Sequence, residues 1–371
     1  MKIAFLAGAN SIHSVRWVKF FADRGHQIVW ISFAPPIPEA TDSVEKVKFY
    51  EIKPSPLSDI NGLFAIRYLP SAVKQIKKIL QAEKPDVLHV HSAGTYGLAG
   101  ALADFHPMIL TPWGSDILLG GLIRKFALMF VVDRADTYTC DGENTFQKLI
   151  GLGAEREKIH FIRFGTDVDK FRPSQSKEVE LPQGSSTSKK LKVISLRSLI
   201  SIYDIETLIK AAAIVVKETP NVEFVIAGDG NQKEYLLDLT AKLNLTMLNL
   251  VRFVGRVNNE ELPALLQAAD IYVSTALSDS GLSASTAEAM ATGLPVVVTD
   301  TGDNKDWVDN NFVIPVKSPE MLAQKLITLI NDEKLRAAQG ARNRQIIEDK
   351  NNYQIEMEKV EKVYENLVTR S

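Results

Sequence analysis

The 371-residue chain contains one cysteine, Cys140, and no long uninterrupted apolar run. A single cysteine excludes an intrachain disulfide and a zinc site built from several cysteines, and it fits a reducing compartment. The longest apolar stretch, residues 117–132, is interrupted by Arg124 and Lys125 and falls short of the roughly 20 residues that a membrane span needs. The apolar run at residues 3–7 is too short for a secretory signal. We therefore expect a cytoplasmic protein without a transmembrane anchor.

The chain also lacks an excess of charge of either sign. Its formal net charge is -2, with 43 Lys and Arg against 45 Asp and Glu, and no basic run is interleaved with aromatic residues. No nucleic-acid partner is expected from such a surface. The content of 45% hydrophobic and 24% charged residues is ordinary for a globular protein, and the length exceeds what one core usually serves. Two domains are expected.

Short apolar runs alternate with helical patterns twice along the chain. In the first half the predicted strands are residues 3–7, 28–33, 87–91, 108–111, 137–140 and 160–163. In the second half they are residues 191–196, 222–227, 250–254, 271–274, 295–299 and 312–315. Such alternation is typical of parallel, doubly wound sheets. The predicted fold class is α/β, with two Rossmann-like domains that face a central cleft and a ligand site that straddles both.

The expected domains are residues 1–173 and 191–351. Residues 174–190 form a polar tract that buries little, so they are predicted to be a linker. The charged tail from residue 319 to 369 has a strong helical pattern. Its end, about residues 352–371, is expected to pack back on the first domain.

The most informative stretch is residues 278–300. Small and hydroxylated residues lead into a short predicted helix with one acid, Glu288, which ends at Gly293 and Pro295 before a β-branched strand. The start of a helix has unpaired backbone N–H groups and partial positive charge, so a diphosphate can dock there without a metal. The Glu288 carboxylate only accepts hydrogen bonds, which suits the hydroxyls of a ribose. A solvated surface helix is the alternative interpretation.

The order and spacing of several segments resemble the retaining GT-B glycosyltransferases, specifically glycosyltransferase family 4 (group 1). The segments are Asp86–His91, Phe164–Pro173, Ile226–Gly230, Arg252–Arg256, Ala269–Ser274 and the helix described above. The resemblance covers nearly the whole chain. It implies a metal-independent, retaining transfer of a hexose-type sugar from a nucleotide-diphosphate donor, of the UDP or GDP type, to an acceptor hydroxyl, with no further cofactor.

The partners that the resemblance implies are a nucleotide sugar and a glycan or lipid-linked acceptor, in the synthesis of cell-surface polysaccharide, glycolipid or glycoconjugate. Two basic segments of the first domain are compatible with peripheral binding to anionic lipid at the inner face of the membrane. The residues concerned are Arg67, Lys74, Lys77, Lys78, Lys84, Arg124 and Lys125. A solvated helix face plus a core helix explains the same residues.

The donor site that the resemblance implies departs from the family pattern at its first carboxylate. Of the family's two glutamates on this helix, Glu288 matches the second, which holds the ribose. Ser280 stands at the position of the first, and the neighbouring Asp279 is the candidate substitute for the contact with the sugar. Further donor contacts are implied for Gly228, Gly255, Ser280, Gly281, Leu282 and Ser283.

A second departure concerns the cations that grip the diphosphate. Arg197 matches the family's arginine, but Tyr203 stands where the family has a lysine. Charge balance predicts a substitute cation, and Arg256 is preferred over Lys305 because it follows a predicted strand end. A solvated turn is the alternative for Arg256.

The first domain is implied to supply the acceptor side and part of the donor site. Trp113 stands where many members have a histidine, and it can stack on a sugar or serve as a buried structural residue. His91, at a strand end, is a catalytic candidate, with a structural role as the alternative. The loop of residues 8–14 follows the first strand and adds Gly8 and Asn10 on the donor side and His13 and Ser14 on the acceptor side.

Other classes remain open on the sequence alone. A nucleotide-sugar 2-epimerase or a phosphorylase shares this two-domain fold, and a non-catalytic sugar-nucleotide-binding partner subunit would explain the departures from the pattern. Asp167 and Asp169 imitate the aspartate motif that binds Mn²⁺ in the other glycosyltransferase fold. Their place in the chain favours a turn or cap instead, and no metal site is predicted.

Overall fold

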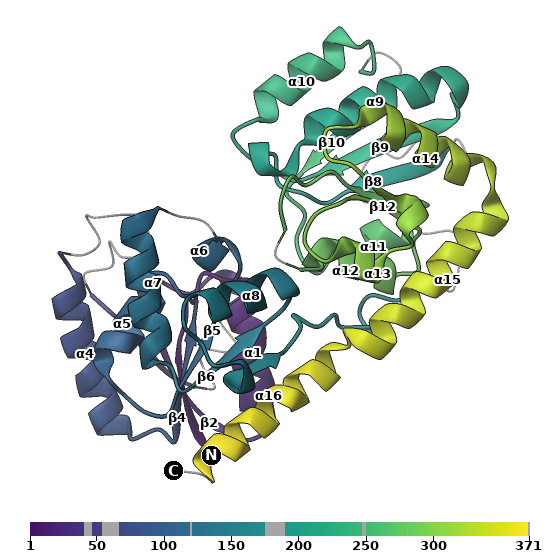
Figure 1. Cartoon of the computed structure of the whole chain (residues 1–371). Coiled ribbons are helices and arrows are strands. Elements are labelled where there is room, and N and C mark those ends of the chain that lie inside the picture. The colour runs from purple at the N-terminus through teal and green to yellow at the C-terminus, as the bar shows by residue number, and fades with distance from the viewer. Residues whose placement is uncertain are drawn as a thin grey trace. The chain divides into compact units, whose positions relative to one another are not determined.

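The computed structural model describes residues 1–40, 47–53, 67–118, 121–174, 190–246, 250–279 and 281–369 (Figure 1). They form two compact units. Unit 1 contains Met1–Arg163 and the chain from Glu356 on, and unit 2 contains Phe164–Ile355. Except for Ser174 and Lys190, the predicted linker lies outside the described residues, and so does Ser280.

Unit 1 is built on a parallel sheet that has seven strands in the described part of the chain. Across the sheet they are β3 (Lys48–Glu51), β2 (Gln27–Ser32), β1 (Lys2–Leu6), β4 (Val87–His91), β5 (Met108–Thr111), β6 (Thr137–Cys140) and β7 (Ile159–Phe161). The order reverses between β1 and β4, and the carboxyl ends of the strands beside such a switch point are where α/β folds bind ligands.

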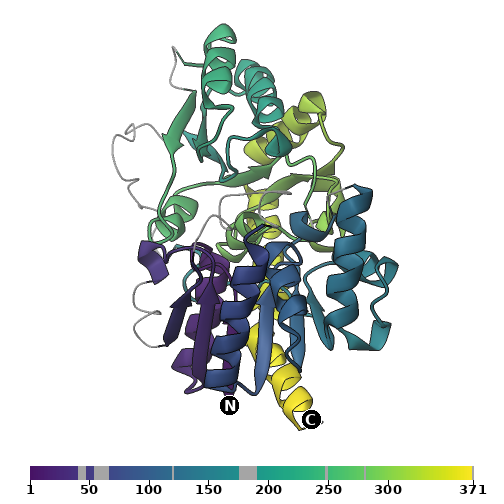
Figure 2. The same ribbon diagram turned by 90° about the vertical axis from the view of Figure 1, so that its left-hand side faces the viewer.

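Helices cover both faces of this sheet (Figure 1). On one face α5 (Thr95–Ala103) packs between α4 (Leu69–Glu83) and α7 (Leu122–Arg134). Figure 2 looks onto this layer. On the other face lie α1 (Ile12–Asp23) and the last helix, α16 (Tyr353–Val368), whose side chains contact α1, β4 and His26, the residue before β2. Two short helices, α6 (Ser115–Leu118) and α8 (Glu143–Gly151), complete the unit.

Unit 2 repeats the architecture with six parallel strands among its described residues. Their order is β10 (Val251–Gly255), β9 (Val222–Ala227), β8 (Leu191–Ser195), β11 (Ile271–Ser274), β12 (Val296–Thr299) and β13 (Val313–Ile314). The switch point lies between β8 and β11. The two parallel sheets confirm the predicted α/β fold class.

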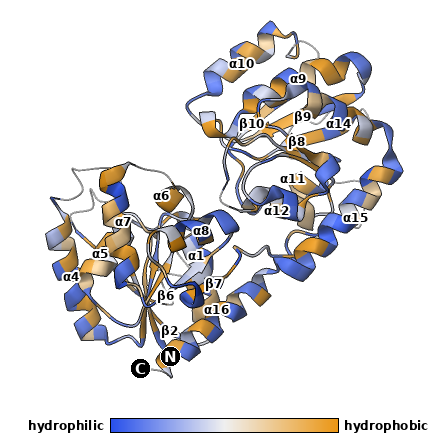
Figure 3. Cartoon of the chain, viewed as in Figure 1, coloured by the Kyte–Doolittle hydropathy of each residue, from blue (hydrophilic) through white to orange (hydrophobic). Residues whose placement is uncertain are grey.

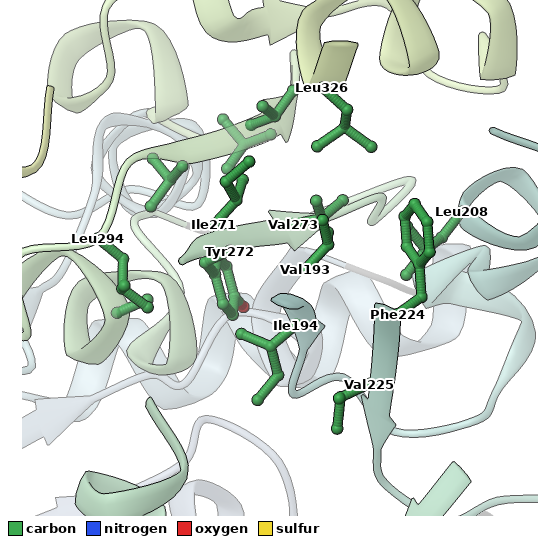
Figure 4. Close-up of a cluster of buried hydrophobic side chains, with 14 of the residues drawn as sticks. Val193, Ile194, Leu208, Phe224, Val225, Ile271, Tyr272, Val273, Leu294 and Leu326 are labelled. Atoms are coloured by element: carbon green, nitrogen blue, oxygen red, sulfur yellow. The ribbon is translucent and has the colours of Figure 1, made fainter. Parts of the chain in front are cut away.

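The helices of unit 2 enclose a hydrophobic core around β8, β9 and β11 (Figure 4). Apolar residues concentrate on the strands, whereas the helices carry both kinds (Figure 3). The helices are α9 (Ile205–Glu218), α10 (Lys233–Lys242), α11 (Leu262–Gln267), α12 (Ala284–Ala291), α13 (Asn304–Trp307), α14 (Pro319–Asn331) and α15 (Glu333–Lys350). Helix α9 packs against α14, and α12 packs against α15. None of the described helices is long and apolar enough to span a membrane.

The boundary between the units differs from the expected one at residue 173, because residues 164–173 belong to unit 2. Phe171 is buried in the core of unit 2. Arg344 of α15 donates Nη1 hydrogen bonds to the carbonyls of Val168 at 2.9 Å and Phe171 at 2.6 Å. These contacts are made by backbone groups and one arginine, which local sequence patterns do not reveal.

Candidate functional site

Arg197 and Asp279 lie at the switch point of unit 2. Arg197 follows β8 and Asp279 follows β11, the two strands between which the strand order reverses. Arg197 Nη2 donates to Asp279 Oδ1 at 2.7 Å, and the two side chains are only 7% and 13% exposed. Unit 2 thus holds a buried ion pair where α/β folds bind their ligands.

Three further groups surround the Arg197 guanidinium. Its Cζ lies 4.0 Å from the centre of the Tyr203 ring, which is cation–π distance. Its Nη1 donates to Ser285 Oγ at 3.4 Å, and that oxygen also accepts from the buried Tyr272 hydroxyl at 2.9 Å. Arg197 Nε is buried and has no hydrogen-bond partner among the described residues. A buried N–H donor without a partner is costly, so this atom is a candidate for contact with a ligand.

Burial is the largest influence on the pKa of both members of the pair. It lowers the pKa of Arg197, but the electrostatic attraction of Asp279, Tyr272 and Tyr203 outweighs it, so that the pKa lies above its ordinary value. Burial raises the pKa of Asp279 against the attraction of Arg197. The site therefore holds a permanent cation beside a carboxylate whose charge is poorly solvated, and a more highly charged phosphate can replace that carboxylate as the partner of Arg197.

Helix α12 begins beside this pair. Ser283 is its N-cap: Ser283 Oγ accepts from Thr286 N at 3.4 Å and lies 2.8 Å from Thr286 Oγ1. The first N–H groups of a helix have no partner within it and attract anions. Ser285 and Glu288 are three residues apart, so they share a face of the helix, and Glu288 is half-buried. A carboxylate on the same face as the anion site can accept hydrogen bonds from hydroxyl groups.

Two glycines, Gly228 and Gly302, let their loops pack directly against the backbone of Arg197 and Asp279. A Cβ on Gly302 would lie 2.6 Å from Gly281 O and 3.0 Å from Asp279 O. A Cβ on Gly228 would collide with the carbonyl oxygen of Arg197. Any residue larger than glycine at position 228 or 302 would therefore push away the backbone that carries Arg197 or Asp279.

The other predicted donor residues of unit 2 are placed less centrally. Gly255 ends β10 and accepts a hydrogen bond from Gly228 N at 2.8 Å, and Leu282 packs against the core. Arg256 is exposed, and Lys305 pairs with Asp300 at 2.6 Å. At the position where the family has a lysine, the ring of Tyr203 stacks on Arg197.

In unit 1 the residues predicted at the switch point come together around His91. This histidine ends β4, and its Nδ1 lies 3.4 Å from Ser14 Oγ of α1. Its ring meets those of Trp17 at 5.0 Å and Trp113 at 5.1 Å edge-on. His91 Nε2 is buried and has no hydrogen-bond partner in the described ranges. His13 lies against Trp113, with ring centres 5.7 Å apart.

Burial makes these histidines poor bases. It lowers the pKa of His91 to about 3 and, with a smaller effect of Arg16, that of His13 to about 4. The neighbouring His89 is fully buried and its pKa also lies well below the ordinary value, mainly through burial. All three imidazoles are therefore neutral near pH 7 and can exchange hydrogen bonds with a neutral hydroxyl.

The remaining predicted residues of unit 1 lie in loops at the carboxyl edge of the sheet. Gly8 is in a tight turn, where a Cβ would come within 2.7 Å of Asn10 Oδ1, and Asn10 itself is exposed. Trp113 is half-buried, and its backbone N–H donates to Asp116 Oδ1 at 2.9 Å. The expectation that the site spans both units stays a prediction.

The aspartates that imitate a metal motif form a turn. Asp167 Oδ1 accepts backbone hydrogen bonds from Asp169 at 3.2 Å and Lys170 at 2.9 Å, as the turn interpretation predicts. In the part of the chain that the structure describes, no three His, Cys, Asp or Glu side chains are grouped so as to hold a metal ion.

Sequence reasoning missed the side chains of Tyr272 and Ser285, which connect β11 and α12 to Arg197. A tyrosine within an apolar strand was a usable signal, because a buried hydroxyl needs a partner. Tyr203 was noted only as a lost lysine. Its stacking on Arg197 depends on the turn η3 (Ser201–Tyr203), which is fixed by a hydrogen bond from Thr275 Oγ1 to Tyr203 O at 3.0 Å.

Comparison with known proteins identifies the family of this chain. The model of the family "Glycosyl transferases group 1" matches residues 176–346, and that of "Glycosyl transferase 4-like" matches residues 2–141. The chain belongs to the group 1 glycosyltransferases. It is a glycosyltransferase of the GT-B fold.

Two curated relatives and one solved structure illustrate the family. N-acetyl-alpha-D-glucosaminyl L-malate synthase of Bacillus anthracis is 23% identical, over 97% of this chain and 93% of the relative. A GDP-mannose-dependent monoacylated alpha-(1-6)-phosphatidylinositol monomannoside mannosyltransferase of Corynebacterium glutamicum is 26% identical, over 74% and 73%. The structure of Anabaena Alr3699/HepE in complex with UDP-glucose is 20% identical, has a TM-score of 0.82, and covers 99% of this chain and 100% of that protein.

Proposed function

We propose that this glycosyltransferase moves a hexose-type sugar from a UDP or GDP donor to a hydroxyl of a glycan or lipid-linked acceptor, with retention at the anomeric carbon and without a metal. The observation that carries the proposal is Arg197, a buried cation with one unpartnered N–H beside the start of α12. Together they offer fixed positive charge to a diphosphate. The expected setting is the cytoplasm, in the synthesis of polysaccharide, glycolipid or glycoconjugate.

The names of similar proteins support this choice of donor and acceptor. The Anabaena protein was solved with UDP-glucose, and the Corynebacterium enzyme is named for GDP-mannose and a phosphatidylinositol mannoside. Both donors are nucleoside diphosphates linked to a hexose. The acceptor in the name of the Corynebacterium enzyme is a lipid.

In the proposed step, the bond between the anomeric carbon and the β-phosphate oxygen breaks, and its electron pair stays on the phosphate. The acceptor oxygen attacks the anomeric carbon from the same face, and its proton passes to the departing phosphate oxygen. Negative charge grows on the diphosphate as the bond breaks, so Arg197 and the first amides of α12 stabilise the transition state more than the ground state.

The two carboxylates of the site take the hydroxyl groups of the donor. Glu288 accepts hydrogen bonds from the ribose. When the diphosphate takes over Arg197, the carboxylate of Asp279 is released and accepts from hydroxyls of the transferred sugar. An acceptor-only group cannot favour a phosphate, so each carboxylate also keeps the diphosphate in one orientation.

In unit 1 the proposal gives the acceptor to His13, Ser14, His91 and Trp113, with Gly8 and Asn10 nearer the donor. Their imidazoles are neutral because burial lowers the pKa of His91 to about 3 and that of His13 to about 4. A neutral imidazole can orient an acceptor hydroxyl by a hydrogen bond, but it is too weak a base to remove its proton fully.

Mass spectrometry after incubation with a panel of UDP- and GDP-sugars tests the proposal, in parallel without EDTA and with EDTA to remove metals. A transferase slowly hydrolyses one donor to free sugar and nucleoside diphosphate, even without acceptor. Conversion of the donor to its 2-epimer would identify an epimerase instead. Binding without any turnover, with or without acceptors, would identify a non-catalytic subunit. Turnover that stops in EDTA would contradict the metal-independent mechanism.

A further inference from the structure

Helix α7 carries the largest exposed apolar side chains of its unit at its N-terminal end. Ile123 is 80% exposed, Leu122 76%, Phe126 70% and Met129 41%. The opposite side of α7 buries Leu128, Val131 and Val132 in the core. Packing within unit 1 therefore explains the second set of residues but not the first. Large apolar side chains gathered on one exposed segment mark an interaction surface.

Two cations are interleaved with these apolar residues. Arg124 and Lys125 are exposed, and the first turn of α7 has no acidic residue. Arg124 Nη2 donates to the carbonyl oxygen of Asp116 at 2.8 Å, but positive charge at a helix N-terminus opposes the helix dipole, so the dipole of α7 does not account for the two cations. Figure 3 shows hydrophobic and hydrophilic residues alternating along this helix. The combination of exposed apolar and basic side chains is typical of segments that insert into an anionic lipid surface.

The rest of the helical layer adds positive charge. Helices α4 and α7 both pack against α5. Helix α4 exposes Lys74, Lys77 and Lys78. At the opposite end of α7, Arg134 pairs with Asp104 at 2.9 Å. The exposed basic side chains named here thus lie toward the N-terminal end of α7 and along α4.

We propose that the N-terminal segment of α7, residues 122–129, docks this enzyme on an anionic bilayer. The apolar side chains enter the boundary between headgroups and acyl chains, while Arg124 and Lys125 bind the anionic headgroups. A second copy of the chain is a poorer occupant, because a symmetric interface would bring the two basic pairs against each other. The inference goes beyond the proposed reaction and does not depend on it.

Flotation of the full chain with lipid vesicles tests the docking. The probes are pure phosphatidylcholine vesicles and mixed phosphatidylcholine and phosphatidylglycerol vesicles, each at low and high salt. We expect binding to the mixed vesicles that weakens with salt. Binding that is equal for both vesicle types, or absent from both, would overturn the proposal.

Two double variants separate the apolar from the electrostatic contribution. Ile123→Gln with Phe126→Gln should weaken binding by at least about tenfold, because two large side chains no longer leave water. Arg124→Gln with Lys125→Gln should cost about fivefold per cation at low salt and reduce the salt dependence. The altered side chains are exposed, so folding is expected to be unaffected. Binding of either variant like the wild type would contradict the proposed docking mode.

Matched controls come from unit 2. Leu237→Gln with Met321→Gln changes two apolar side chains that are 38% and 40% exposed, and Lys217→Gln with Lys334→Gln removes two exposed cations. Both should bind vesicles like the wild type.

Light scattering gives a second readout. A wild-type dimer that the Ile123 and Phe126 variant abolishes would assign the surface to a second copy. Donor hydrolysis should be unchanged in all four variants, so failure of the docking proposal stays distinguishable from failure of the proposed reaction.

Discussion

At the switch point of unit 2 a buried arginine keeps its charge, whereas at that of unit 1 a buried histidine is neutral. Arg197 is paired with Asp279 at 2.7 Å and stacked on Tyr203. His91 lies edge-on to two tryptophan rings with Ser14 Oγ 3.4 Å from its Nδ1, and burial lowers its pKa to about 3. Both residues lie beside the point where the strand order of a parallel sheet reverses.

The difference shows how one topology serves two kinds of ligand. A charge that stays buried must have a partner, and an incoming anion can become that partner. A site whose buried side chain is neutral, like that of His91, suits neutral polar groups instead. Unit 2 is thus suited to the diphosphate of a donor and unit 1 to the hydroxyls of an acceptor.

Removing the buried cation should have the largest effect. Arg197→Ala is expected to slow transfer by at least about 100-fold, because the leaving diphosphate loses a fixed positive charge. Steady-state kinetics with the donor identified by mass spectrometry would measure it. Arg172→Ala, which removes an exposed arginine of the same unit, is the matched control and should retain full activity. An unchanged rate in Arg197→Ala would remove the basis of the comparison.

Glu288→Ala should also reduce transfer by about 100-fold, through loss of a positioned carboxylate. Since Glu288 is proposed to hold the ribose, the free nucleoside diphosphate should bind more weakly as well, and Glu288→Gln should recover part of the loss. Inhibition of transfer by the nucleoside diphosphate measures that affinity. Equal inhibition constants in the wild type and Glu288→Ala would place the ribose elsewhere.

Asp279→Asn tests whether the partner of Arg197 acts on the sugar. The amide keeps the shape but removes the charge, so the nucleoside diphosphate should bind at least as tightly as in the wild type, because it no longer competes with a carboxylate. Transfer should fall by about tenfold or more, because charged acceptors form stronger hydrogen bonds than neutral ones. A parallel loss of nucleotide affinity and transfer would argue that Asp279 only positions Arg197.

Removing the ring of Tyr203, which stands where the family has a lysine, should have a smaller effect on nucleotide binding. Tyr203→Ala removes a cation–π contact with Arg197 and should weaken nucleotide binding about fivefold. Tyr203→Phe keeps the ring and serves as the control, with binding within about twofold of the wild type. Titration calorimetry measures both affinities. If the phenylalanine variant lost as much as the alanine variant, the hydroxyl rather than the ring would be the functional group.

The neutral histidines should make unit 1 sensitive to mild acid. The pKa of His91 is about 3 in the folded state and near 6.5 in the unfolded chain. Below pH 6.5 the unfolded chain therefore binds a proton that the folded chain does not, and the free energy of unfolding decreases until the pH reaches the folded pKa of about 3. Between pH 7 and 5 the loss should be about 2 kcal/mol from His91 alone. Amide exchange of β4 would report it, and His91→Asn should flatten the dependence. Equal sensitivity of β8 in unit 2, which has no such histidine among its described residues, would contradict this cause.

The strand pattern made most of the fold predictable. All predicted strands are found, because a buried parallel strand is a continuous apolar run bounded by polar residues. The strand β3 was missed, since it lies at the sheet edge and its half-exposed sequence includes Lys48 and Glu51. The two units divide after Arg163 and not at the expected residue 173, because residues 164–173 contact Arg344, which lies far along the chain.

The candidate site was predictable as far as single motifs reach. Arg197, Asp279 and Glu288 were named from the sequence, but the Arg197 to Asp279 pairing and the stacking on Tyr203 were not. Both arise where loops after β8 and β11 meet, 82 residues apart for the ion pair, so no local pattern encodes them. For the same reason Ser285 and Tyr272 emerged only with the fold.

Titration calorimetry of UDP and GDP against the wild type and Arg197→Ala, with EDTA present, tests the central claim most directly. We expect one of the two nucleotides to bind the wild type without metal, and Arg197→Ala to lose about 100-fold in affinity. Equal affinity in the two proteins, or no binding of either nucleotide to the wild type at millimolar concentration, would contradict a buried arginine as the diphosphate anchor.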